Sequence, residues 1–118
     1  MPSLPEELYD VFYVTQLTRG TTLERIVAVD RVRVEPHKWS KTHRHLQAET
    51  VLYIEKGFGT VVINGAGHDA LPGAWIYIPA GAWHHVLPVQ VELVFTSIQS
   101  PPIHDEATGR HDLEPLKD

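Results

Sequence analysis

The sequence contains no cysteine, which excludes disulfide bonds, thiolate nucleophiles and zinc sites built on cysteine. It also has no apolar run near the roughly 20 residues that a membrane-spanning helix needs. The formal net charge is −5 and the Lys and Arg residues are scattered, so no basic patch suggests a nucleic-acid partner. The first ten residues carry acidic side chains where a signal peptide has basic ones. We therefore expect a soluble, cytoplasmic protein that binds neither membrane nor nucleic acid.

Sustained helical periodicity is missing as well. No segment repeats apolar residues every 3.6 positions, whereas Val32 and Val34 alternate with Arg31 and Arg33, as in a half-buried strand. Short β-rich segments of this kind are separated by turn residues at nearly regular intervals. The pattern predicts an all-β barrel or sandwich with little helix. Strands are expected near 9–17, 23–35, 50–55, 60–64, 68–71, 74–78, 83–87 and 91–99.

The chain length of 118 residues suits one hydrophobic core but no second one. We therefore expect a single domain over residues 1–118. Its barrel core is predicted at about 23–99, preceded by an N-terminal strand or arm at 1–22. Residues 100–118 are polar and contain proline, which indicates a C-terminal extension.

Side chains that bind metals are concentrated in the middle of the chain. Residues two apart on a strand share a face, so His43 and His45 point the same way, and Glu49 could return to that face. Two imidazoles and one carboxylate can hold a divalent transition metal. His84 follows the tight turn at 79–81, where its side chain can point into a barrel and meet the others.

These positions resemble the two motifs of the cupin family, G-x5-H-x-H-x3,4-E-x6-G and G-x5-P-x-G-x2-H-x3-N. The matching residues are the core of the first motif and four positions of the second: His43, His45, Glu49, Gly73, Pro79, Gly81 and His84. There are three departures. His37 replaces the opening Gly of the first motif, its closing Gly is one residue late at Gly57, and Pro88 replaces the final Asn of the second.

The resemblance implies a double-stranded β-helix, also called a jelly-roll barrel, that holds one metal ion. The ligands implied are His43, His45, Glu49 and His84, and the ion is Fe, Mn, Ni, Co, Cu or Zn. His85 is expected on the opposite face of its strand, outside the metal shell. Small cupins usually form homodimers through their N-terminal strands, a role for which residues 9–17 are suited.

Three histidines and one carboxylate leave one or two positions of a six-coordinate metal open, which favours chemistry over a purely structural metal. We therefore expect a metal-dependent enzyme that acts on a small organic molecule. It is a dioxygenase, or an isomerase or lyase in which the metal is a Lewis acid. The alternative is a non-catalytic module that binds or senses a sugar or metabolite, because no further carboxylate has motif support as a general base.

Four aromatic residues lie in strands or turns that border the expected barrel: Tyr53, Trp75, Tyr77 and Trp83. We predict them as walls of the substrate pocket. Their alternative role is core packing, which is the more common one for aromatic side chains.

Overall fold

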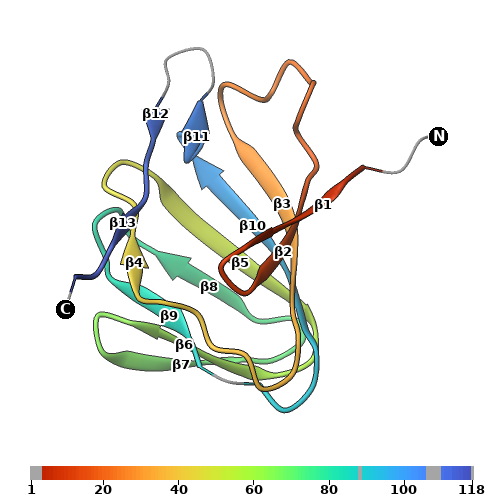
Figure 1. The fold of residues 1–118 in the computed structure, drawn as a ribbon, viewed down its shortest axis with the longest axis vertical. Helices are drawn as coiled ribbons and strands as arrows, with labels where there is room; N and C mark the ends of the chain where they lie inside the picture. The colour runs from red at the N-terminus through yellow and green to blue at the C-terminus, as the bar shows by residue number, and fades with distance from the viewer. Residues whose placement is uncertain (1–3, 88, 106–109, 118) are drawn as a thin grey trace.

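The computed structural model describes residues 4–87, 89–105 and 110–117, so Pro88 lies outside the described residues. Across these ranges the chain forms strands and turns and no helix, which confirms the all-β prediction (Figure 1). Accordingly, no helix of these described ranges is long and apolar enough to cross a membrane. The strands are β1 (Glu6–Tyr9), β2 (Phe12–Gln16), β3 (Ala28–Val34), β4 (His43–Arg44), β5 (Glu49–Lys56), β6 (Gly59–Ile63), β7 (Ala66–Ala70), β8 (Trp75–Ile78), β9 (His84–Val86), β10 (Leu93–Ser100), β11 (His104–Asp105), β12 (Arg110–His111) and β13 (Glu114–Pro115).

Two antiparallel sheets form the jelly-roll barrel. One has six strands in the order β1-β2-β3-β10-β5-β8, and the other has five in the order β13-β4-β9-β6-β7. Strands that are distant in sequence pair at the centre of the larger sheet, where β10 lies between β3 and β5. A separate hairpin, β11–β12, stands at one end of the barrel (Figure 1).

The core lies between the two sheets, and strand alternation decides which side chains reach it. On β5, Leu52 and Ile54 are buried while the intervening residues are more exposed. On β3 the same alternation buries Val32 and Val34 and leaves Arg31 exposed. The two arginines of this strand pair with glutamates outside the barrel.

Gly57 ends β5 in a place where no side chain fits. Its φ is +83°, and a Cβ atom there would lie 2.1 Å from the carbonyl oxygen of Glu92. This close approach requires glycine, so Gly57 is a true motif position although it arrives one residue later than the spacing from Glu49 allows.

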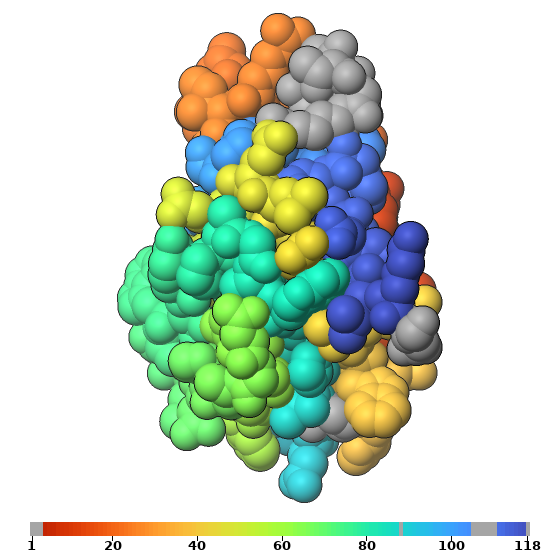
Figure 2. Space-filling view, turned by 90° about the vertical axis from the view of Figure 1, so that its left-hand side faces the viewer, coloured from red at the N-terminus to blue at the C-terminus, as the bar shows by residue number. Residues whose placement is uncertain are grey.

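Both terminal segments are built into the sheets. β1 and β2 extend the six-stranded sheet, with β1 at its edge. The C-terminal segment runs back along the barrel, where β13 pairs with β4 and brings Pro115 opposite His43. Figure 2 shows this face, with the C-terminal residues in dark blue beside the yellow segment that contains β4. The predicted extension therefore touches the histidine motif.

Candidate metal centre

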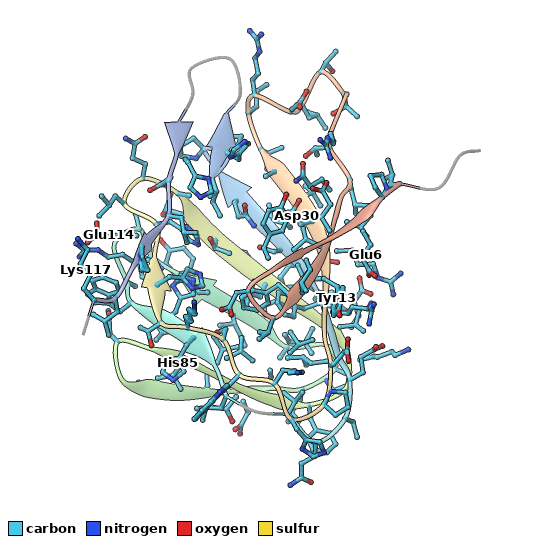
Figure 3. The ribbon with its side chains drawn as sticks, in the orientation of Figure 1. Glu6, Tyr13, Asp30, His85, Glu114 and Lys117 are labelled. Atoms are coloured by element: carbon cyan, nitrogen blue, oxygen red, sulfur yellow. The ribbon has the colours of Figure 1, made fainter. Side chains whose placement is uncertain are left out.

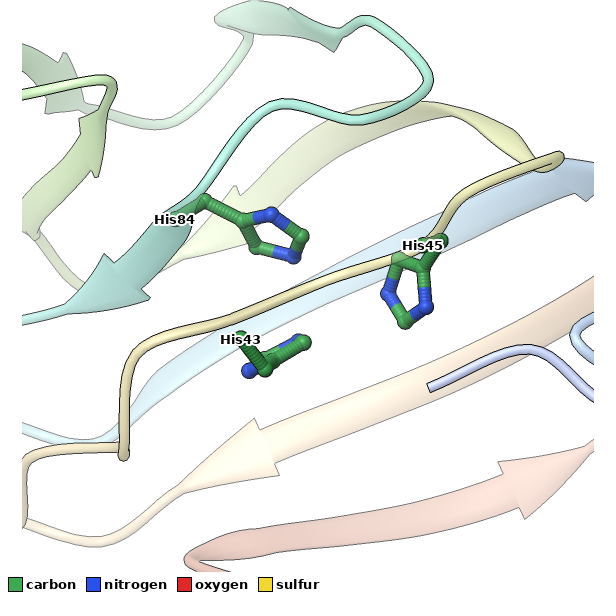
Figure 4. A group of neighbouring side chains, drawn as sticks. All are labelled: His43, His45 and His84. Atoms are coloured by element: carbon green, nitrogen blue, oxygen red, sulfur yellow. The ribbon is translucent and has the colours of Figure 1, made fainter. Parts of the chain in front are cut away.

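Three histidines converge inside the barrel (Figure 4). His43 on β4 lies directly opposite His84 on β9, and their ring centroids are 4.3 Å apart. His45 follows β4 and lies 5.1 Å from the His43 ring and 5.2 Å from the His84 ring. One nitrogen from each ring lies within 4.8 Å of the other two. The structure thus brings together three of the four predicted ligand residues.

Each of the three rings donates its Nδ1 hydrogen to a backbone carbonyl, because a carbonyl oxygen can only accept. The acceptors for His43, His45 and His84 are, in that order, the carbonyls of Lys41 (3.1 Å), Asp112 (2.7 Å) and Ala82 (3.0 Å). These bonds fix the tautomer and leave each Nε2 lone pair free. The residues present therefore fit a metal ion that is held by three neutral imidazoles.

Burial keeps the three rings neutral. Desolvation lowers the pKa of His43 and of His45, although the carbonyl hydrogen bonds oppose it. Desolvation, with the charge that neighbouring His43 would carry, lowers the pKa of His84 to about 3. The unprotonated nitrogens that a metal needs are consequently present at neutral pH.

Glu49 does not join the histidines. Its side chain is exposed on the outer face of β5, where the Tyr77 hydroxyl donates a hydrogen bond to it. The neighbouring residue Thr50 points inward instead and is only 4% exposed. Strand alternation explains the difference, because Thr50 shares its face with the buried residue Leu52. The expectation that Glu49 returns to the histidine face is corrected accordingly.

The sequence carried a signal for this correction. The first motif allows three or four residues between its second histidine and its glutamate, and six between that glutamate and its closing glycine. Counting back from Gly57 places the glutamate position at Thr50, and the four residues between His45 and Thr50 also satisfy the first interval. The chain therefore has a hydroxyl where the motif has a carboxylate.

The four aromatic residues predicted for the pocket lie elsewhere. Trp75 is 65% exposed and its ring packs against Tyr53, with the centroids 4.6 Å apart. Tyr77 is exposed beside Glu49, and the Trp83 ring lies under the guanidinium of Arg44. None of the four lines the cavity described below. Each occupies the outward position of its strand or turn, as alternation dictates.

His85 lies on the other side of β9 from His84 and is not a member of the three-histidine group. Its Nδ1 atom is 3.2 Å from the hydroxyl of Thr42. Figure 3 labels His85.

A cavity of about 810 Å³ opens beside the histidines and extends between the two sheets. Its apolar wall includes Val32, Leu52 and Phe95. The six-stranded sheet also contributes a polar wall, formed by Asp30, Thr50, Ser97 and Gln99. A cavity of this size accommodates a small organic molecule.

Sequence reasoning missed Asp30, although a signal was present. Val34, Val32 and Asp30 are spaced two apart on β3, so alternation places the carboxyl group on the same face as the two buried valines. Burial raises the pKa of Asp30 to about 6, which a hydrogen bond from Gln99 only partly offsets.

The C-terminal segment supports the centre through Asp112. Its carboxylate accepts the backbone N–H groups of residues 46, 47 and 48 at 2.6, 2.9 and 2.8 Å, and its carbonyl accepts Nδ1–H of His45. Asp112 is 8% exposed. One residue therefore fixes both the His45 ring and the turn that follows it.

The fold recurs in solved structures of several enzymes. Pac13 from Streptomyces, described as a nucleoside dehydratase and also solved with uridine, is 15% identical, with 97% of this chain and 85% of that chain covered and a TM-score of 0.76. A sugar phosphate isomerase from Silicibacter pomeroyi is 19% identical over 86% of this chain and 76% of that one, with a TM-score of 0.67.

Salicylate 1,2-dioxygenase from Pseudoaminobacter salicylatoxidans, solved with gentisate, is 16% identical, with 97% of this chain and 31% of that chain covered and a TM-score of 0.77. At these identities the similarities show the fold alone. No curated protein matches the chain in sequence. A family model described as a cupin domain matches residues 30–95. This match spans more than half of the chain, and the chain therefore belongs to the cupin family.

Proposed function

We propose that this cupin is a metal-dependent enzyme that acts on a small organic molecule, with His43, His45 and His84 as its metal ligands. The observation that carries the proposal is that all three rings donate Nδ1–H to backbone carbonyls and face a cavity with neutral Nε2 atoms. Burying three imidazole nitrogens without a hydrogen-bond partner costs free energy of folding. A bound metal ion would offset this cost, because each nitrogen would then coordinate the ion.

The ligand set suits Fe, Mn, Ni, Co, Cu or Zn, since imidazole binds all of these ions. His43, His45 and His84 would hold the ion through neutral imidazoles, so no protein carboxylate among them would offset its charge. When bound, it supplies Lewis acidity, which polarises a substrate oxygen.

The cavity beside the histidines would hold the substrate. Val32, Leu52 and Phe95 exclude water and contact the apolar part of the molecule. Thr50 and Gln99 offer a hydroxyl and an amide to its oxygen atoms. The similar structures support an enzyme in this fold, because their names include a dehydratase, an isomerase and a dioxygenase.

The alternative is a binding or sensor module for a sugar or metabolite. The cavity alone suits both functions, whereas a carboxyl group among its lining residues favours catalysis, because a binder does not require a proton acceptor. Asp30 is such a group, and we therefore place the enzyme first.

Elemental analysis of purified variants tests the metal centre. We expect about one metal ion per chain in the wild type and almost none after His43→Ala or His84→Ala. His85→Ala is the matched control, because it removes a neighbouring imidazole that lies outside the group, and it should keep the ion. Full metal content in both His43→Ala and His84→Ala would rule the centre out.

We also propose that the protein is a homodimer that uses the N-terminal edge of its larger sheet. β1 is the edge strand there, and Leu8 on it is 56% exposed. Light scattering should give twice the chain mass of 13.3 kDa, and a species of 13.3 kDa contradicts the dimer.

A further inference from the structure

We propose that Asp30 is the proton-transfer residue of the cavity and that the reaction is an isomerisation or an elimination next to a carbonyl group. This inference rests on the proposed function, which is compatible with both dioxygenation and proton-transfer chemistry. The arrangement around Asp30 favours proton transfer.

Asp30 stands across the cavity from the histidines. It lies on β3 in the six-stranded sheet, whereas His43 and His84 belong to the five-stranded sheet. Its neighbours in register are Gln16 on β2 and Ser97 on β10. Figure 3 labels Asp30 beside β3, and all of these residues line the same cavity. A molecule that fills this cavity therefore borders both the histidines and Asp30.

The surroundings of Asp30 suit a general base, because its carboxyl group is oriented by an amide and is not held in an ion pair within the part of the chain that the structure describes. The Gln99 Nε2 group donates to Asp30 at 3.2 Å and to the Ser97 hydroxyl at 2.7 Å, so the amide orients the carboxyl. Among the described residues, no Lys or Arg forms a salt bridge with Asp30. Burial without a cation raises the pKa of Asp30 to about 6, where a carboxylate can take up a proton and return it near neutral pH.

Other titratable groups also line this cavity. Besides the three histidines of the candidate metal centre, they come from β1 and the turn after it, from the segments that precede β3 and β4, and from the β11–β12 hairpin: Tyr9, Asp10, Arg19, Glu24, Arg25, Lys41, His104 and His111. Of these, Tyr9 has a pKa that is raised mainly by its hydrogen bond to Glu7 and slightly by the charge of Asp30. None of them appears among the causes of the shift at Asp30, which is dominated by burial.

A second observation indicates that this wall binds a ligand. The Thr50 hydroxyl lines the cavity, is almost fully buried and has no hydrogen-bond partner within the described protein. Buried polar atoms are nearly always paired, so an unpaired one beside a cavity suits a substrate oxygen. Together with the Gln99 amide, it selects a substrate that carries hydroxyl and carbonyl groups, such as a sugar derivative or a hydroxy acid.

The proposed step moves one proton. The Asp30 carboxylate forms an O–H bond with a hydrogen from the carbon next to the carbonyl, and that C–H bond breaks. Its electron pair forms a C=C bond as the carbonyl becomes an enolate. For an α-hydroxy carbonyl compound, an isomerisation is completed when Asp30 returns the proton to the former carbonyl carbon and the α-hydroxyl proton passes to the former carbonyl oxygen, so that the α-carbon becomes the new carbonyl. An elimination is completed when a β-hydroxyl group leaves and takes the proton as water, and Asp30 is again ionised.

Hydrogen–deuterium exchange tests this role without knowledge of the natural substrate. Protein loaded with Zn²⁺ is incubated in D₂O with pyruvate, 2-oxoglutarate, dihydroxyacetone phosphate or fructose 6-phosphate, and proton NMR follows deuterium entry next to the carbonyl. We expect the wild type to exceed the protein-free rate for at least one probe. Asp30→Asn should slow the exchange by about 100-fold or more, as loss of a general base does.

The controls separate the possible failures. Asp69→Asn removes an exposed carboxylate on β7 and should exchange like the wild type. Asp30→Ser is a second variant in case Asn disturbs folding, which circular dichroism monitors. Exchange at the wild-type rate in both Asp30 variants overturns the role of Asp30.

Two outcomes concern the wild type itself. If it binds zinc but exchanges no probe, the proton-transfer inference fails and the metal centre stands. If it binds no zinc, the proposed function itself fails. Equal zinc content in Asp30→Asn and wild type, together with lost exchange, supports the inference.

Discussion

At the scale of single residues, a shift of one position on a strand decides which chemistry enters the cavity. Glu49 and Thr50 are adjacent, yet one is exposed to solvent and the other lines the cavity. On β3 the same alternation carries Asp30 inward with Val32. The sequence identifies residues of the types that bind metals or transfer protons. Only the direction of each side chain shows which of them face the cavity.

Restoring a carboxylate at the inward position should strengthen metal binding. Thr50→Glu places an anionic oxygen on the face that looks into the cavity, where it can add to the three imidazoles. We expect the zinc dissociation constant to fall at least about tenfold in calorimetric titrations. Residues that merely support a metal ligand already change metal affinity by about 10-fold to 100-fold, and a fourth ligand should have an effect of at least this size. Glu49→Gln is the matched control and should leave the zinc dissociation constant unchanged. A loss of zinc affinity in Glu49→Gln contradicts the conclusion that Glu49 is not a metal ligand.

Removing the charge of Asp30 should stabilise the protein above pH 6. The folded-state pKa is raised from 3.8 to about 6, so the folded protein binds this proton more tightly than the unfolded chain. The stability contribution is therefore complete below pH 3.8 and is lost as the pH rises through 6.

From a shift of about two pH units, we expect Asp30→Asn to raise the free energy of unfolding at pH 8 by about 3 kcal/mol. The gain should vanish near pH 4. Urea unfolding of metal-free protein at both pH values measures it, with Asp69→Asn as the control. If the variant is less stable than the wild type at pH 8, the prediction is wrong and the ionised carboxylate stabilises the folded protein.

At the scale of elements, β4 is only two residues long and depends on its neighbours for its position. β9 pairs with it on one side and β13 on the other. The turn after His45 is held by the carboxylate of Asp112, which comes from the C-terminal segment. A polar tail in the sequence thus becomes the outer support of the histidines.

Loss of the Asp112 carboxylate should weaken metal binding. Asp112→Ala leaves three backbone N–H groups without their acceptor and frees the segment whose carbonyl orients His45. We expect zinc affinity to fall by about 10-fold to 100-fold, as for other residues that orient a ligand. Glu114→Gln changes a more exposed carboxylate on β13 and should have a smaller effect. Zinc affinity equal to that of the wild type in Asp112→Ala refutes this role.

At the scale of the whole molecule, the fold was accessible from the sequence and the complete site was not. Period-two alternation and turn residues predict an all-β barrel, and the spacing of His43, His45 and His84 places three rings in it. Those signals are local or belong to a motif. Alternation along β3 indicates that Asp30 faces inward, but the proximity of Asp30 and Asp112 to the site arises from contacts between segments that are distant in sequence.

The barrel as a whole explains why the outer aromatics were misplaced. Trp75 and Tyr77 alternate with the buried residues Ile76 and Ile78 on β8, so either set could face inward by periodicity alone. On this strand the smaller aliphatic residues point into the barrel, and the rings of Trp75 and Tyr77 cover its outside. Sequence alone cannot choose between the two faces when both are apolar.

The central claim is that three histidines, and not Glu49, hold the metal. X-ray absorption spectroscopy at the zinc edge measures the ligands of the bound ion directly in solution. We expect about three imidazole ligands with Zn–N distances near 2.0–2.1 Å, the remainder being water, and the same spectrum for Glu49→Gln. A shell with fewer than two imidazoles, or one that loses an oxygen ligand in Glu49→Gln, contradicts the account.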